Sequence, residues 1–160
     1  MTSAEPSLPD HEGGRATPSQ RVELALPAQP ELLFLARMTA AAVASRAEFG
    51  FDQVEDLRLA IDELWVTLAG EDGSNGRVHL VYEWDDEVVE VTGTLVSERG
   101  DVPKASRART PKAVPTLNEL SERILDALVD EHGTDRVDGE PRAWLRMRHH
   151  APTRPPEATA

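Results

Sequence analysis

Cysteine is absent from the 160-residue chain. Without thiols the protein can form neither a disulfide framework nor a thiolate metal site, so nothing in it requires an oxidising compartment. No run approaches the roughly 20 apolar residues that span a bilayer, and residues 1–20 lack the basic start and apolar core of a signal peptide. Together these absences predict a cytoplasmic protein without a membrane partner.

Positive charge is also scarce. The chain has 17 Lys and Arg against 29 Asp and Glu, which gives a formal net charge of -12. A negative protein is repelled by the phosphates that supply most of the affinity for nucleic acids. The composition therefore argues against a nucleic-acid partner.

Several common catalytic patterns are missing as well. No Ser stands in a nucleophile-elbow sequence, and no two His residues have the spacing of metal ligands. Gly70, Gly73 and Gly76 form a glycine-rich stretch, but it follows a predicted helix, whereas a phosphate-binding loop follows a strand and opens a helix. This stretch is therefore interpreted as a helix stop and a turn.

Large apolar residues are rare at both ends of the chain. Residues 1–20 and 150–160 are rich in Pro, Ser, Ala, Gly and charge, and such segments cannot repay the entropy lost on ordering. They are predicted to be disordered tails. The residues between them, 21–149, are enough for one domain with a sizeable core.

Hydrophobic periodicity predicts the elements of this domain. Alternation of apolar and polar residues indicates strands, and steps of three and four residues indicate helices. Strands are expected at 21–26, 77–84 and 87–96, helices at 30–48, 52–69 and 116–132, and a final hairpin within 135–149. Asp138 and Gly139 mark the turn of that hairpin, after which Ala143, Leu145 and Met147 point to one side.

The helix at 52–69 has the strongest periodic pattern in the chain. Asp52 and Glu55 match a capping box at its start, with Asp in place of Ser or Thr. Apolar residues recur after this at helical spacing and are expected to form one face toward the core: Val54, Leu57, Ile61, Leu64 and Leu68. The first helix is rich in alanine, which suits either the core or a close-packed dimer interface.

A long basic segment separates the second hairpin strand from the third helix. Residues 97–115 contain five Lys and Arg and only Val as a larger apolar residue, and such loops are usually functional or disordered. The third helix is expected to start with a capping box of Thr116 and Glu119. Its core face is expected to carry Leu117, Leu120, Ile124 and Leu128.

This order of elements predicts an α+β fold. Consecutive strands joined by tight turns favour a mixed, mostly antiparallel sheet, and the helices would cover one of its faces. The expected architecture is a two-layer α/β sandwich with three helices on one face.

Two adjacent acids, Asp62 and Glu63, interrupt the apolar helix at 52–69. Neighbouring helical residues point about 100 degrees apart, so the pair cannot share a proton or hold one metal ion. Glu63 lies nearly opposite the core face, with Leu59 and Val66 beside it. Two interpretations stay open: a functional acid under partial cover, or one of several acids on a solvated face.

The segment FGFDQVEDLRLAIDELWVTL, residues 49–68, resembles the N-box helix of the histidine-kinase-like (Bergerat, or GHKL) ATPase fold. More narrowly, it is similar to the small anti-sigma factor serine kinases of Gram-positive bacteria. The resemblance extends over about 21–149 and implies that fold, with ATP and Mg²⁺ as cofactors. It also implies Glu63 as the catalytic residue of the N-box and a nucleotide-binding position one turn later, which is Thr67.

Thr67 departs from the family pattern, which has Asn as the magnesium ligand at this position. A threonine hydroxyl can ligate magnesium but is shorter than an Asn amide, so coordination should be weaker or lost. The family's Asp-x-Gly motif, expected near 93–101, has no acid at the required spacing from Gly93 or Gly100. The basic segment at 97–115 stands where the family has its ATP lid.

The resemblance implies a regulator that sequesters a sigma factor and is released by an anti-anti-sigma factor, with weak or degenerate ATP binding. The alternative is an active ATP-dependent serine kinase acting on the anti-anti-sigma factor. A third possibility is the same fold with some other protein partner. Dimerisation is implied by the family as well.

Overall fold

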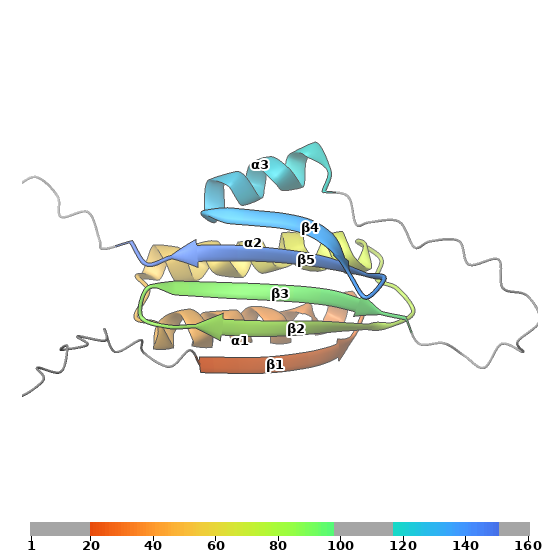
Figure 1. The fold of residues 1–160 in the computed structure, drawn as a ribbon, viewed down its shortest axis with the longest axis horizontal. Helices are drawn as coiled ribbons and strands as arrows, with labels where there is room; N and C mark the ends of the chain where they lie inside the picture. The colour runs from red at the N-terminus through yellow and green to blue at the C-terminus, as the bar shows by residue number, and fades with distance from the viewer. Residues whose placement is uncertain (1–19, 98–116, 151–160) are drawn as a thin grey trace, which may run out of the picture.

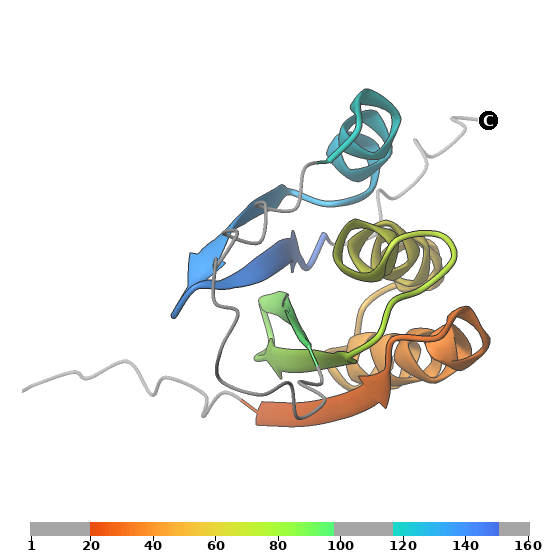
Figure 2. The ribbon, with the colours of Figure 1, turned by 90° about the vertical axis from the view of Figure 1, so that its right-hand side faces the viewer.

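The computed structural model describes residues 20–97 and 117–150. One antiparallel sheet has the strand order β1-β2-β3-β5-β4, and three helices lie on one of its faces (Figures 1 and 2). The elements are β1 (Gln20–Pro27), a 3-10 turn (Pro30–Leu32), α1 (Leu33–Arg46), α2 (Phe51–Ala69), β2 (Arg77–Trp84), β3 (Val88–Val96), α3 (Glu119–Leu128), β4 (Glu131–Val137) and β5 (Glu140–Arg148). The predicted α+β two-layer sandwich is confirmed, and its five strands pair antiparallel rather than in a mixed sheet.

Several segments predicted from the sequence lie mostly outside the described residues. The predicted tails and the basic segment at 97–115 lie outside the described residues, apart from Gln20, Ser97 and His150 at their edges. Within the two described ranges, no helix is long and apolar enough to cross a membrane.

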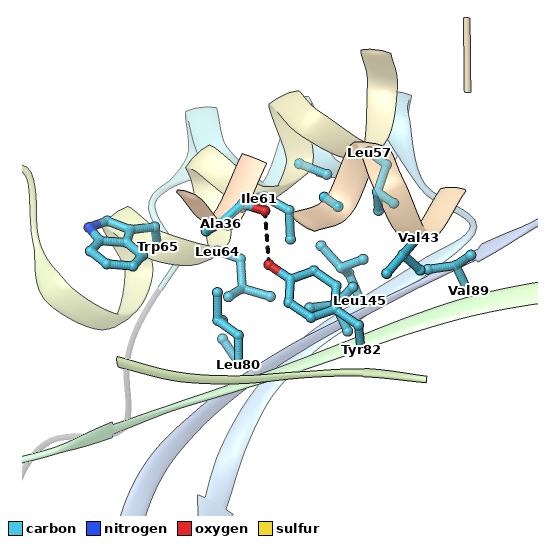
Figure 3. Packing of buried hydrophobic residues seen from close by; sticks show 14 of the residues in the cluster. Ala36, Val43, Leu57, Ile61, Leu64, Trp65, Leu80, Tyr82, Val89 and Leu145 are labelled. Atoms are coloured by element: carbon cyan, nitrogen blue, oxygen red, sulfur yellow. Dashed lines mark hydrogen bonds between the residues drawn. The ribbon is translucent and has the colours of Figure 1, made fainter. Parts of the chain in front are cut away.

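The core lies between the sheet and helices α1 and α2. Leu57, Ile61, Leu64 and Leu68 of α2 are buried, and Val54 packs partly against them. The five-residue face predicted from helical spacing is therefore confirmed, and Figure 3 shows Leu57, Ile61 and Leu64 among the buried residues of α1 and the sheet.

Helix α1 uses its alanines for this core. Ala36, Ala40 and Ala44 are fully buried within the single chain, so these residues do not form a dimer interface. Their small side chains let α1 lie close to the sheet, where the hydroxyl of Tyr82 donates a hydrogen bond of 3.0 Å to the carbonyl oxygen of Ala36 (Figure 3). Burial raises the pKa of Tyr82, which keeps this phenol protonated and donating.

The start of α2 differs from the predicted capping box. The helix begins at Phe51, its N-cap is Gly50, and no side chain caps it. Asp52 lies inside the first turn, where a negative charge is favourable near the helix N-terminus. Glu55 pairs instead with Arg58, at 2.7 Å. The predicted cap at Asp52 is wrong because the N-cap lies two residues earlier, at Gly50.

Helix α3 is shorter than expected. Its N-cap is Asn118, whose side-chain oxygen accepts a hydrogen bond of 2.7 Å from the backbone N–H of Ser121. The predicted cap at Thr116 is therefore wrong. The helix also ends at Leu128 rather than near His132, because the following residues pair with β5 as strand β4.

The core-facing side of α3 differs as well. Of the residues expected on its core face, Leu117 and Leu128 pack partly against the core, whereas Leu120 is 67% exposed. Ser121 and Leu125, one turn apart, are the two buried positions of the helix. A serine therefore faces inward at the first turn of α3, in a place where the sequence pattern predicted leucine.

Both predicted hairpins are present. At the turn between β4 and β5, Asp138 and Gly139 each have positive φ, as a tight two-residue turn requires. Ala143, Leu145 and Met147 of β5 are buried, so their predicted common direction is confirmed.

Candidate functional site

Glu63 lies on α2 and contacts the first turn of α3. The hydroxyl of Ser121 donates a hydrogen bond of 2.6 Å to Oε2 of Glu63. The side of α2 that carries Glu63 is thus partly covered by α3, and Glu63 itself is half-buried. The structure therefore supports the covered-acid interpretation over the solvated face.

Ser121 is the one polar residue that is buried among those the structure describes, with 4% of its surface exposed. Its position is fixed twice: its backbone N–H bonds to Asn118, and its side chain bonds to Glu63. A hydrogen bond to a charged carboxylate is stronger than one between neutral groups. Glu63 thus satisfies a buried hydroxyl that would otherwise be costly.

Thr67 lies one turn after Glu63 on the same helix. Its hydroxyl donates a hydrogen bond of 2.7 Å to the backbone carbonyl oxygen of Glu63. This bond to the residue four positions earlier is a common use of threonine in helices, and it directs the hydroxyl along the helix axis.

The space beside Thr67 is nearly filled. A cavity of about 10 Å³ remains there, which is room for about one water molecule. Pockets for small molecules and cofactors typically measure about 300–1,000 Å³. Helices α2 and α3 and strands β4 and β5 all contribute to its wall, with lining residues Leu64, Thr67, Leu117, Leu125, Gly133, Thr134, Ala143, Trp144 and Leu145.

Asp62 points toward α1 rather than toward Glu63. Its carboxylate forms a two-pronged ion pair with Arg37, in which the Nη2–Oδ2 distance is 2.7 Å. The hydrogen bond from Arg37 to Asp62 raises the pKa of the guanidinium above its ordinary value. Asp62 thus contacts α1, whereas Glu63 contacts α3. The two adjacent acids do not form a dyad, as expected from their directions on the helix.

Among the described residues, the atoms around Thr67 leave little free space for a magnesium–nucleotide complex. Carboxylate and hydroxyl oxygens are suitable ligands for Mg²⁺. However, one oxygen of the Glu63 carboxylate accepts a hydrogen bond from Ser121, the Thr67 hydroxyl donates to the backbone, and the cavity beside Thr67 holds little more than a water molecule. Across 20–97 and 117–150, no cluster of three or more carboxylate or histidine side chains could hold a metal ion.

Gly93 has a packing role in this structure. A Cβ atom at this position would lie 2.6 Å from Leu68 Cδ1 and 2.8 Å from Leu64 Cδ2, so the missing side chain lets α2 approach β3 closely. The rest of the expected Asp-x-Gly region, from residue 98 onward, lies outside the described residues.

A larger hollow of about 530 Å³ lies at another part of the molecule, at the end of β3 and β5. Its two arginines are paired with acids: Arg146 bonds to Glu90 at 2.7 Å, and Arg148 bonds to Glu131 at the same distance. It contains neither Glu63 nor Thr67. This hollow is therefore no substitute for the site on α2.

The sequence interpretation missed Ser121. Thr116 and Glu119 match a capping box, and this pattern predicts a helix start two residues before the observed cap, Asn118. Asn118 is a favourable N-cap residue, and it accepts a hydrogen bond from the N–H of Ser121, three residues later. This spacing is the sequence signal for the true start of the helix.

Comparison with known proteins identifies similar kinases. Serine-protein kinase RsbW of Bacillus subtilis is 34% identical over 83 residues, 50% of this chain and 50% of its own. The protein of the same name from Listeria monocytogenes serotype 4a is 36% identical over 74 residues, 42% of this chain and 47% of its own. The one from Oceanobacillus iheyensis is 29% identical over 83 residues, 50% and 51%.

The chain spans about half the length of the curated relatives it matches. No family model matches it. The resemblance inferred from the N-box segment is nevertheless confirmed, because several relatives with one name match the chain and the fold has the expected layers. The chain is a homologue of the serine-protein kinases named RsbW, whose fold is that of the histidine-kinase-like ATPases.

Proposed function

We propose that the protein is a cytoplasmic regulator of the anti-sigma factor type. It binds and sequesters a sigma factor, is controlled by an anti-anti-sigma factor, and has weak or degenerate ATP binding. The observation that carries the proposal is the site on α2, where Glu63 stands at the N-box position while Thr67 replaces the magnesium ligand beside a nearly filled space. The similarity to serine-protein kinases supports the choice of partners.

The nucleotide part of the proposal rests on three features of the described residues. Thr67 presents a short hydroxyl that is bonded to its own helix. Glu63 is bonded to Ser121, and the cavity next to both helices is about 10 Å³. A protein of this kind can retain a surface for its partners while its phosphoryl-transfer site loses activity, because the two depend on different residues.

A second candidate function is that of an active serine kinase acting on the anti-anti-sigma factor. The kinase activity in the names of the relatives favours it. In this alternative Glu63 is the catalytic residue, and Thr67, despite its shorter side chain, helps to hold Mg²⁺ and ATP.

Glu63→Gln separates the two functions. If the protein is a binding regulator, we expect its affinity for purified candidate sigma factors to change less than about twofold. The amide keeps the shape of the Glu63 side chain, and most single residues of an interface contribute little to the binding free energy. Affinity is measured by calorimetry without nucleotide. Glu55→Gln, on the same helix, is the matched control.

The kinase alternative predicts a different result for the same variant. Phosphorylation of the anti-anti-sigma factor would be measurable in the wild type and would fall about 10²- to 10⁴-fold in Glu63→Gln, the usual contribution of a general base. Such a loss, with Glu55→Gln unaffected, would contradict the proposal that the site is degenerate. Failure of every candidate sigma factor to bind would contradict the proposal of sequestration.

A further inference from the structure

We propose that the hydrogen bond between Ser121 and Glu63 is an internal latch. It holds α3 against α2 and keeps the nucleotide-facing side of α2 closed. This inference rests on the proposed function, since it concerns the regulation of the same site. It explains why the described residues leave little free space for a magnesium–nucleotide complex beside Thr67.

Ser121 takes the place that a substrate hydroxyl would need. A general base accepts a proton from a hydroxyl within about 2.6–3.2 Å, and Ser121 Oγ lies 2.6 Å from Glu63 Oε2. While this contact exists, that carboxylate oxygen is occupied by the protein's own serine. A second hydroxyl that approaches Oε2 from the side of α3 therefore competes with Ser121.

The N-terminal half of α3 has few other attachments. Leu125 is the one buried apolar residue of the ten-residue helix, and Leu120 is 67% exposed. An isolated helix of this length is marginal in water, so its position depends on its contacts with the rest of the fold. Besides the packing of Leu117 against the core, the bond from Ser121 to Glu63 holds this end of α3 to α2.

The C-terminal half of α3 is held separately. Asp126 and the ring of His132 on β4 are 2.9 Å apart, and the N–H of Val129 bonds to the carbonyl oxygen of Leu125. Figures 1 and 2 show α3 running beside β4 at the edge of the helical layer, next to α2. Loss of the latch would therefore free the start of the helix while its end stays attached to β4.

Opening would change the space beside Thr67. Leu117 and Leu125, one just before α3 and one within it, form part of the wall of the cavity of about 10 Å³. If the start of α3 moves outward, this wall moves with it, the cavity grows, and Glu63 loses its serine partner. One contact thus controls both the acid and the space next to it.

Hydrogen exchange of α3 tests the latch. In Ser121→Ala and in Glu63→Ala we expect amide exchange of α3 to rise on the order of tenfold or more, as for the loss of a hydrogen bond to a charged group. The double variant should show no further rise, because both changes remove one interaction. Glu63→Gln, which keeps an accepting oxygen, should show a smaller rise, and Ser45→Ala on the exposed side of α1 should show none.

Titration with ATP and Mg²⁺ tests the closure. We expect Ser121→Ala to bind ATP more tightly than the wild type, with its sigma-factor affinity unchanged. Unchanged exchange in Ser121→Ala, or additive effects in the double variant, would overturn the latch. Faster exchange with unaltered ATP affinity would overturn its control of the site. Failure of sigma-factor binding would affect only the proposed function, because exchange is measured on the isolated chain.

Discussion

Ile61→Asp is expected to prevent the domain from folding. Ile61 is fully buried on the face of α2 that packs on the sheet, and an aspartate there would be a charge without a partner. Such changes cost more than about 4 kcal/mol, which is most of the stability of a typical domain. Circular dichroism and thermal melting should therefore show no cooperative transition for this variant.

Leu59→Asp is the matched control for this prediction. Leu59 lies two residues earlier on α2 and is 52% exposed. The same chemical change there should leave the melting transition nearly in place, because surface substitutions usually alter stability by about 0.5 kcal/mol or less. If Ile61→Asp melts cooperatively like Leu59→Asp, the side of α2 that carries Ile61 does not face the core.

Gly93→Val is expected to have the second largest effect on stability. A Cβ at Gly93 would already lie 2.6 Å from Leu68 and 2.8 Å from Leu64, and valine adds two further methyl groups in the same place. The buried side chains of Leu64 and Leu68, or helix α2 itself, would have to move away from β3. Overpacking of this kind costs about 1–3 kcal/mol and sometimes more, and we expect the upper end of that range by urea denaturation.

Thr92→Val provides the comparison. Thr92 is the neighbouring residue on β3, and its side chain lies on the opposite face of the sheet, where it is half-buried. Valine is favourable in strands, so this variant should be about as stable as the wild type. Equal stabilities for Gly93→Val and Thr92→Val would mean that α2 and β3 are not in close contact at this point.

The sequence was most informative where structure depends on local spacing. The five apolar residues of α2 follow a helical period within fifteen residues, and the strand alternations are equally local, so both were predicted correctly. The start of strand β4, at Glu131 and His132, was expected to be the end of a helix. Its residues from Glu131 to Thr134 are mostly polar, and their pairing with β5 decides their conformation.

Helix starts were less predictable. Capping-box patterns occur at Asp52 and Thr116, yet the helices begin after Gly50 and Asn118. A cap shifts by one or two residues when a neighbouring residue can serve as well, so pattern matching alone locates it poorly. The error at α3 concealed Ser121, and with it the inward direction of its side chain.

The site itself could be predicted only in part. Glu63 was located by resemblance, and its partial cover was suggested by Leu59 and Val66. Its partner is 58 residues away in the sequence, so no local pattern connects the two. The contact arises because α3 packs on α2 after the intervening hairpin has been completed, which is a property of the tertiary fold.

We propose that the protein keeps the fold of the serine-protein kinases to which it is similar, while its nucleotide site is degenerate and closed. The most direct test is calorimetric titration of the purified chain with ATP, with and without Mg²⁺. The account predicts weak binding, with a Kd of ~1 mM or above, and little dependence on Mg²⁺. Thr67→Asn should then gain Mg²⁺-dependent affinity. A micromolar Kd for the wild type that requires Mg²⁺ would contradict the account.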